Sequence, residues 1–501
     1  MHMCSPVLHG IHLFANTTTT KERRGSPCGK DMLFSSLVFM QYFLPIVALL
    51  YFAVKNLNLK NAILLAASIL FYAWGEPKYV ILMLVSISIN YVFGRLIEHY
   101  DQNGGRRRLM MILCVAINLG LLGYFKYFNF FIHILSLAAG RQVIEAREIA
   151  LPIGISFYTF QALSYVLDVY RRQNKAQKNY WYLALYVSFF PQLIAGPIVK
   201  YHDIEEQIGR REVDFQKAAY GIKRFTYGLA KKVILANTFA LVVDQVFGNS
   251  PQTLGTKLIW FTLVLYALQI YYDFSGYSDM AIGLGSMFGF KFMENFNYPY
   301  MSSSIKEFWR RWHISLSTWF REYLYIPLGG NRKGNVRTYV NLFIVFLATG
   351  LWHGAGTNFV VWGVYYGIFI VAERLFLGKW LEKNPIKLLN HFYALFVVLI
   401  GWLLFRVESM TQIRALLSGM VHMRQGIYTI RMFADNRVFF LTVVGILFCG
   451  PVQSLFGGLK KRLYDEKHTG ILDIVIMAAL LFICVMLLVN NTYNPFIYFR
   501  F

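Results

Sequence analysis

Long apolar segments recur along almost the whole of this 501-residue chain, and they constrain its fold more than any other feature. A helix needs about 20 mainly apolar residues to cross a bilayer, and shorter apolar helices can be buried or re-entrant. We therefore expect an all-α, polytopic membrane protein. The clear candidate spans are residues 33–54, 61–74, 79–97, 109–124, 150–169, 182–199, 258–272, 339–352, 359–372, 388–405, 438–449 and 471–489.

Three further apolar stretches, residues 125–139, 234–247 and 281–290, are predicted to be additional or partial spans. Together the segments predict about 11 to 13 membrane helices, with re-entrant and interfacial helices among them. The composition agrees with this class of protein. A chain with 56% hydrophobic residues, 15% charged residues and a mean hydropathy of +0.44 departs from soluble globular usage toward membrane proteins.

The net charge of +23 suggests nucleic-acid binding, but the distribution of the charge excludes it. The basic residues lie in short loops between apolar segments rather than in one patch on a soluble domain. This pattern fits membrane topology and contact with anionic lipid headgroups. The five cysteines show neither disulfide nor zinc spacing, so we expect no metal site. Membrane lipid is an expected partner, and nucleic acid is not.

Residues 1–31 differ from the rest of the chain, because they are polar and contain no signal-peptide core. They are either a disordered extension or they precede the true initiator, since Met32 is a natural start for the first span. Residues 32–501 are expected to form a single membrane domain. Basic loops follow the first, third and fifth spans, so these loops are cytoplasmic if the first span begins outside.

One histidine lies in the middle of a stretch, residues 338–372, that contains no Asp, Glu, Lys or Arg. An ionisable side chain at membrane depth is costly and tends to mark function. His353 is therefore a candidate functional residue. It follows Trp352 and precedes glycines at positions 354 and 356, which let a substrate approach closely. The structural alternative is a histidine that hydrogen-bonds a carbonyl inside a polytopic core.

Residues 305–323 are predicted to form a different kind of element, a continuous amphipathic helix that lies in the membrane interface. His313 falls at the border of its apolar face. Basic residues of this region (Arg310, Arg311, Arg321, Arg332 and Lys333) either attract the phosphates of a substrate or serve topology and lipid contact. At about 100° per residue, the apolar face collects Ile305, Phe308, Trp309, Trp312, Leu316, Trp319, Phe320 and Tyr323.

Several stretches are long and specific enough to indicate a family: residues 151–161, 190–197, 272–281, 307–317 and 319–331, with the tripeptide at 352–354. In these stretches the chain resembles the membrane-bound O-acyltransferase (MBOAT) family, specifically the bacterial branch with alginate O-acetylases and teichoic-acid D-alanyl transferases. The resemblance runs from about residue 32 to residue 501. It implies a multi-helix membrane enzyme with a central tunnel, in which acyl donor and acceptor meet at a buried histidine.

The resemblance also implies roles for individual residues. His353 matches the catalytic position, where an imidazole would take the proton of an attacking hydroxyl. His313 matches a second histidine of the family, and the alternative for it is to anchor the amphipathic helix. Further candidate tunnel-lining or orienting residues are Asp273, Ser278, Asp279, Asn331 and Trp352. Asp273 and Asp279 are expected in a loop after a span, where a structural hydrogen bond to a helix end is the alternative.

The last residues, 496–501, resemble the terminal motif of small peptides that accompany D-alanyl transferases. Tyr498 is therefore a candidate acyl relay, with interfacial anchoring by an aromatic tail as the alternative. No permanently bound cofactor is expected. The resemblance implies an acyl thioester, acetyl-CoA or an acyl carrier protein, as co-substrate.

These features together predict a multi-pass O-acyltransferase of a bacterial inner membrane. We expect it to take an acyl group, with acetyl preferred, from the cytoplasmic thioester and to pass it across the membrane. The expected acceptor is a hydroxyl of an exported polysaccharide or cell-wall polymer, and a separate extracytoplasmic acyltransferase is an expected partner. The alternatives are D-alanyl transfer to teichoic acid, a transporter or flippase, and a non-catalytic membrane scaffold.

Overall fold

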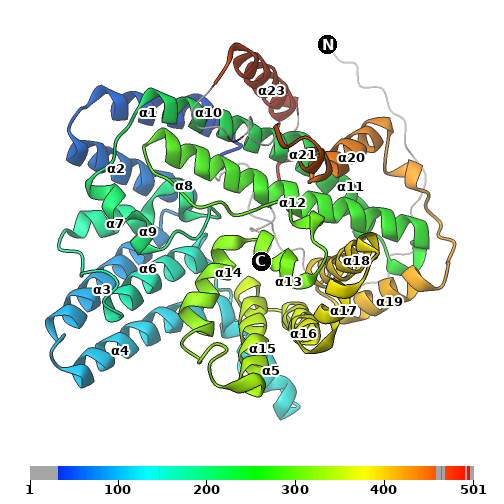
Figure 1. Ribbon diagram of the computed structural model, residues 1–501, viewed down its shortest axis with the longest axis horizontal. Coiled ribbons are helices and arrows are strands. Elements are labelled where there is room, and N and C mark those ends of the chain that lie inside the picture. The colour runs from blue at the N-terminus through cyan, green and yellow to red at the C-terminus, as the bar shows by residue number, and fades with distance from the viewer. Residues whose placement is uncertain (1–31, 146, 459–463, 465–468, 491–492, 497–501) are drawn as a thin grey trace, which may run out of the picture.

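A computed structural model describes residues 32–145, 147–458, 464, 469–490 and 493–496. Its regular structure is helical, and no β-strand occurs in these ranges, so the predicted all-α fold is confirmed. Figure 1 shows the long α12 (Thr256–Met287) crossing the molecule, and this helix is buried along most of its length. Residues 1–31, predicted to be an extension, lie outside the described residues.

Nine helical segments of the described part of the chain are long and apolar enough to cross a membrane, as expected for a multi-pass protein. They are α2 (Leu57–Gly75), α3 (Tyr79–His99), α4–η2–α5 (Gly104–Ala139), α10–η3–α11 (Phe215–Phe247), α12, α16–η7–α17 (Thr357–Lys383), α18 (Lys387–Arg406), α20–α21 (Asn436–Leu455) and α23 (Ile471–Asn490). The other predicted spans correspond to η1 (Phe39–Phe43) with α1 (Leu44–Ala53), α6 (Ile155–Tyr170), α7 (Tyr180–Ser188), α8 (Phe190–Leu193) and α15 (Gly334–His353), while α9 (Tyr201–Gly209) and α19 (Met410–Val421) lie between spans.

The three stretches predicted as additional or partial spans are continuations of longer helices. Residues 125–139 extend α4 through the π-helical turn η2 (Gly123–Tyr127), and residues 234–247 end the α10–η3–α11 segment. Residues 281–287 belong to α12, so the prediction of a loop from Asp273 to Asp279 is wrong. Gly276 explains why the helix continues there. A Cβ at this position would lie 2.7 Å from the carbonyl oxygen of Gly228 in α10, so the glycine is needed for two helix backbones to pack closely.

The predicted continuous amphipathic helix is also wrong, because the chain breaks at Trp312 and His313. Two short helices, α13 (Ile305–Arg311) and α14 (Ile314–Phe320), flank the break, and His313 adopts a left-handed conformation with φ +45°. A neighbouring segment takes over two backbone hydrogen bonds of the break. Asn297 N–H donates to the Arg311 carbonyl at 2.9 Å, and Ile314 N–H donates to the Asn295 carbonyl at 3.0 Å.

The apolar face of this region packs on protein rather than lying in the membrane interface. All eight residues of the predicted apolar face are buried. Trp312 lies against Trp402 of α18, with ring centroids 4.8 Å apart, and Trp319 stacks on Phe160 of α6 at 3.9 Å. Lys306, Arg310 and Arg321, which lie outside that apolar face, are exposed. The residues of the apolar face were therefore predicted correctly, but this face contacts the protein core and not the membrane interface.

Helices α15 and α16 (Thr357–Ala372) form an antiparallel hairpin that carries His353 at its turn. The two helices lie side by side in Figure 1. Their backbones approach so closely that a Cβ on Gly350 would lie 2.3 Å from the Phe359 carbonyl oxygen, and one on Gly363 would lie 2.7 Å from that of Phe346. Small residues permit this contact between membrane helices. The hairpin therefore holds the end of α15 in a fixed position.

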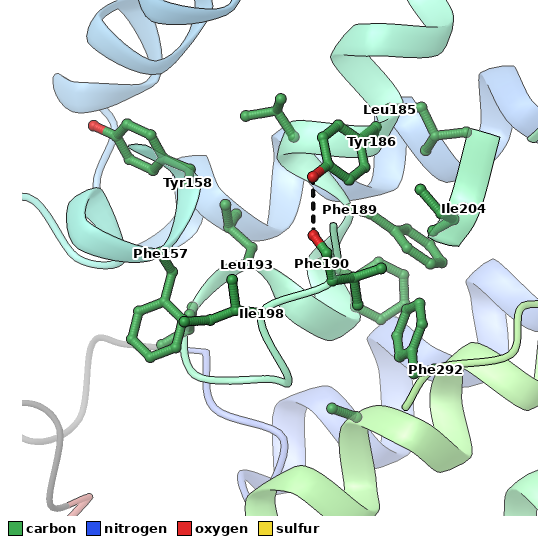
Figure 2. Close-up of a cluster of buried hydrophobic side chains, with 14 of the residues drawn as sticks. Phe157, Tyr158, Leu185, Tyr186, Phe189, Phe190, Leu193, Ile198, Ile204 and Phe292 are labelled. Atoms are coloured by element: carbon green, nitrogen blue, oxygen red, sulfur yellow. Dashed lines mark hydrogen bonds between the residues drawn. The ribbon is translucent and has the colours of Figure 1, made fainter. Parts of the chain in front are cut away.

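Two of the family-like stretches meet in the core beside the break. Figure 2 shows Phe157 and Tyr158 of α6 near Leu193 of α8, within one cluster of buried side chains. The same helix α6 supports α14, since the Trp319 indole N–H donates to the Phe160 carbonyl at 3.0 Å. These contacts position the helix that follows His313.

Candidate active site

The structure brings His313, Trp352 and His353 together in the interior. His353 is the last residue of α15 and His313 lies at the break between α13 and α14, and both are buried. The Trp352 ring is near both imidazoles, with centroids 6.0 Å from His313 and 5.0 Å from His353. Residues separated by 40 positions in sequence therefore share one interior site, as the sequence predicted for the histidines and for Trp352.

Asn295, which the sequence analysis did not identify, orients His313. Its side-chain oxygen lies 3.2 Å from His313 Nδ1 and accepts a hydrogen bond from the Ser315 hydroxyl at 2.9 Å. Its amide nitrogen donates a hydrogen bond to the Ser278 hydroxyl at 3.1 Å. An amide oxygen can only accept, so Nδ1 of His313 carries the proton. The other ring nitrogen, Nε2, then has a free lone pair. It is buried and has no hydrogen-bond partner among the described residues.

His353 is surrounded by aromatic rings. Besides Trp352, the rings of Trp362 and Phe405 lie edge-on at 5.2 and 5.1 Å from its imidazole. Its Nδ1 atom and the indole N–H of Trp352 are both buried, and neither has a hydrogen-bond partner in the described part of the chain. Buried polar atoms are almost always paired in proteins, and unpaired ones often occur at catalytic sites. The site thus offers three unsatisfied polar atoms, His313 Nε2, His353 Nδ1 and Trp352 Nε1.

Lys126 and Tyr127 hold the end of α15 from a distant part of the chain. The Lys126 amine donates to the carbonyl of Trp352 at 2.5 Å and to that of His353 at 3.2 Å, and the Tyr127 hydroxyl donates to the Leu351 carbonyl at 2.5 Å. The last carbonyls of a helix have no partner within the helix, so these two side chains satisfy three of them. Both come from the π-helical turn η2, a feature that often occurs at functional sites.

Lys126 was not predicted as a site residue, although its apolar sequence surroundings are unusual for a lysine. It is the one lysine inside residues 109–139, two apolar stretches predicted as spans, and a lysine at membrane depth is costly without a partner. The sequence could have marked Lys126 as functional or structural, but not as the partner of a helix end 226 residues away.

The two candidate carboxylates of α12 form ion pairs with α10 and η3 (Lys231–Ala236). Asp273 pairs with Lys232 at 2.7 Å, and Asp279 pairs with Arg224 and Lys231, each at 2.6 Å. These pairs join two helices that cross at close range. Ser278, between them in sequence, reaches the histidine site through its contact with Asn295. Phe274 of α12 also lies there, with its ring centroid 4.6 Å from that of His313.

The remaining two candidates lie elsewhere. Asn331 is exposed in the turn before α15, and the 20 residues of that helix place it about 30 Å along the axis from His353. The structure therefore does not bring Asn331 to the site. Tyr498 lies outside the described residues. Phe496, two positions earlier, is buried and stacks on Tyr277 of α12 with ring centroids 4.6 Å apart.

A cavity of about 540 Å³ lies against the same break. It is lined by Trp309, Arg310, Ile314, Ser317, Thr318 and Arg321. Neither arginine forms an ion pair among the described residues, whereas the adjacent Arg311 pairs with Glu307 at 2.6 Å. Ile314, which lines this basic cavity, directly follows His313 in the sequence. The cavity therefore adjoins the chain segment that carries His313.

A multi-pass helical fold with two buried imidazoles, and an indole N–H that has no partner among the described residues, defines a membrane protein with a polar site in its interior. Residues 145–416 match the membrane-bound O-acyltransferase family. Similar proteins include a probable alginate O-acetylase of Pseudomonas aeruginosa, 44% identical over 382 residues that cover 76% of this chain and 73% of the relative. A peptidoglycan O-acetyltransferase of Helicobacter pylori is 37% identical over 424 residues, covering 78% and 80%.

A teichoic acid D-alanyltransferase of Bacillus subtilis is more distant, 29% identical over 246 residues that cover 46% of this chain and 60% of the relative. The chain belongs to the membrane-bound O-acyltransferase family, and it is an acyltransferase. The predicted family and the predicted enzyme class are therefore confirmed. The individual roles of His353 and His313, and the tunnel, stay predictions.

Proposed function

We propose that this membrane O-acyltransferase moves an acetyl group from a cytoplasmic thioester to hydroxyls of an exported polysaccharide or cell-wall polymer. The observation that carries the proposal is a group of three buried polar atoms that find no partner in the described ranges: His313 Nε2, His353 Nδ1 and Trp352 Nε1. Acyl transfer to a hydroxyl requires a base, a hydrogen-bond acceptor and a hydrogen-bond donor at one interior point. The names of the two relatives, an alginate O-acetylase and a peptidoglycan O-acetyltransferase, support acetyl as the acyl group.

Each atom has a chemical task in the proposed reaction. His353 Nδ1 takes the proton of the acceptor hydroxyl, and the oxygen attacks the thioester carbonyl carbon. The Trp352 indole N–H can only donate, so it suits the oxyanion that develops on that carbonyl. His313 Nε2 can only accept and orients a donating group of the substrate. The C–S bond then breaks, and the proton held by His353 passes to the leaving thiolate.

The donor is proposed to approach through the cavity beside the break. A pantetheine-bearing thioester carries phosphates, and the two arginines of this cavity, Arg310 and Arg321, lack acidic partners among the described residues. Guanidinium groups bind phosphate by two parallel hydrogen bonds. The double variant Arg310→Gln/Arg321→Gln should raise KM for acetyl-CoA at least tenfold with a smaller change in kcat. Arg311→Gln, which removes an arginine already paired with Glu307, is the control, and an equal rise there would contradict this assignment.

The central test compares polymer O-acetylation in cells that carry wild type, His353→Ala or His133→Ala at equal membrane abundance. His133 is an exposed histidine of α5 (Phe128–Ala139) and serves as control. We expect acetylation to be lost only in His353→Ala. Normal acetylation in that variant would refute the proposed reaction. Acyl chemistry that persists while polymer export stops would favour a transporter instead.

D-alanyl transfer is the second candidate, because the Bacillus subtilis relative is a teichoic acid D-alanyltransferase. Feeding cells isotope-labelled acetate or D-alanine and analysing the polymer esters separates the two. Label from acetate is expected. Label from D-alanine alone would replace acetyl in the proposal.

Transfer across the membrane is proposed to involve an extracytoplasmic acyltransferase partner and, as an acyl relay, Tyr498. Residues close to Tyr498 in sequence support its role as a relay. Phe496 is buried against α12, and the Pro495 carbonyl accepts a hydrogen bond from the Lys232 amine. Residues 495 and 496 therefore lie in the core beside α12. Tyr498→Phe should abolish polymer acetylation while thioester hydrolysis by the purified protein continues, and full acetylation in this variant would exclude the relay.

A further inference from the structure

A second, larger cavity lies between α13 and the elements that follow α16. It measures about 810 Å³ and opens between the start of α13, the turn η7 (Glu373–Leu377) with α17 (Gly378–Lys383), and the start of α18. Its charged lining residues are Lys306, Arg374, Lys379, Lys387, Glu373 and Glu382. We refer to it as the α17 groove. It is separate from the cavity at Arg310 and Arg321.

The α17 groove carries an excess of positive charge. Its four basic residues form no ion pair with an acidic side chain in the described ranges, in contrast to Lys200, which pairs with Glu322 at 3.0 Å. Glu373 is buried, and its carboxylate already accepts hydrogen bonds from the backbone N–H groups of Ile305 at 2.6 Å and Lys306 at 2.9 Å. Its carboxylate is committed to the N-terminus of α13, where a negative charge is favourable. The Lys387 amine donates to the backbone carbonyl of Glu382 at 3.1 Å. With four basic and two acidic lining residues, the groove keeps a net charge of +2 (4 − 2) that can attract an external anion.

Exposed apolar side chains lie on the same helices as the basic lining residues, next to them in sequence, and we call them the apolar edge. On η7 and α17, Leu375, Phe376 and Trp380 are 49%, 62% and 53% exposed, and Leu388 at the start of α18 is 62% exposed. A short helix with basic residues and exposed aromatic residues suits the membrane interface, where aromatic rings lie at the level of the lipid headgroups. A soluble anion would use only the basic residues. A phospholipid would use both the basic residues and the apolar edge.

We propose that the α17 groove is a binding site for an anionic phospholipid, with its phosphate among Lys306, Arg374, Lys379 and Lys387 and its acyl chains against Phe376 and Trp380. The site borders the segment that leads to His313, because Lys306 belongs to α13 and Glu373 fixes the start of that helix. Binding of the lipid does not depend on acyl transfer. The proposal therefore stands or fails separately from the proposed function.

The test uses the purified full chain and native mass spectrometry with phosphatidylglycerol. Each basic residue near an anionic surface contributes about fivefold to lipid affinity, so Lys379→Gln/Lys387→Gln should weaken retention about 25-fold. The matched control is Lys175→Gln/Lys178→Gln, which removes two exposed charges from the loop after α6. Thermal unfolding of both variants verifies that they are folded.

Three outcomes distinguish the possibilities. Loss of phosphatidylglycerol from the groove variant, with normal retention in the control, supports the site. Equal retention in the two variants, or equal retention of zwitterionic phosphatidylcholine by wild type, overturns it. Displacement of the lipid by an equal concentration of glycerol 1-phosphate also overturns it, since the groove would then bind a free phosphate and not a lipid.

Discussion

Replacement of Lys126 by methionine should inactivate the enzyme while the protein remains folded in the membrane. Methionine keeps the length and the apolar packing of the lysine stem but removes the amine that donates to the carbonyls of Trp352 and His353. Each buried carbonyl that loses its donor costs about 1 to 3 kcal/mol, so the end of α15 is destabilised by about 2 to 6 kcal/mol. This penalty falls on the residues that hold the proposed base.

The expected kinetic effect follows from the position of His353. If the last turn of α15 rearranges to find other donors, the imidazole moves, and a displacement of about 1 Å can reduce rate about 100-fold. We expect kcat to fall by about that factor with KM for the donor nearly unchanged, because the arginine-lined cavity lies on another element. Tyr127→Phe loses one hydrogen bond, to Leu351, and should cost about tenfold at most.

The assay is acetyl transfer by purified protein in lipid nanodiscs, with transferase abundance and thermal unfolding measured in parallel. Lys126→Arg retains a donor and should recover part of kcat. Activity of Lys126→Met within twofold of wild type would refute the reasoning. So would a loss of activity that follows only a loss of folded protein, because Lys126 would then serve stability and not the placement of His353.

Three other variants test separate contacts. Asn295→Ala removes the partner of His313 Nδ1 and should lower kcat about 100-fold, and activity equal to wild type would show that the orientation of His313 is unimportant. Hydrogen bonds to Asp168 and Asp203 raise the pKa of His202 from 6.5 to about 9, so its stabilising effect is complete below about pH 6.5 and is lost as pH rises through 9. His202→Gln should flatten the dependence of thermal stability on pH over that interval, and an unchanged slope would contradict the assignment. Gly350→Ala places a Cβ 2.3 Å from the Phe359 carbonyl oxygen and should destabilise the hairpin by about 1 to 3 kcal/mol, whereas Gly120→Ala, where a Cβ meets nothing within 4 Å, should unfold at or above the wild-type temperature.

Much of the helical architecture could be predicted because it depends on local features. Apolar segments of sufficient length predict spans, and an apolar face at helical spacing predicts burial, as at Trp309 and Leu316. His353 and His313 could be identified from an unusual setting and from family-like motifs. These are properties of short stretches of sequence.

The predictions that proved wrong depend on contacts between segments that are distant in the sequence. Nothing in the residues around His313 disfavours a helix, and the periodic pattern continues across the break. The break exists because Ile314 N–H bonds the carbonyl of Asn295, which no local pattern indicates. Likewise, α12 continues through Gly276 because α10 packs against it there. Lys126 and Asn295 were missed for the same reason, since their partners lie far away in the sequence.

The support of α15 by Lys126 and Tyr127 has a consequence for dividing or recombining the chain. Both residues precede residues 145–416, the region that matches the family. A fragment limited to that region would carry His353 but not the side chains that bind the carbonyls of Leu351, Trp352 and His353. A chimera that takes the region from a relative would join the relative's helix end to Lys126 and Tyr127 of this chain. The smallest interchangeable unit should therefore include η2 together with the α15–α16 hairpin, although more than 200 residues separate them.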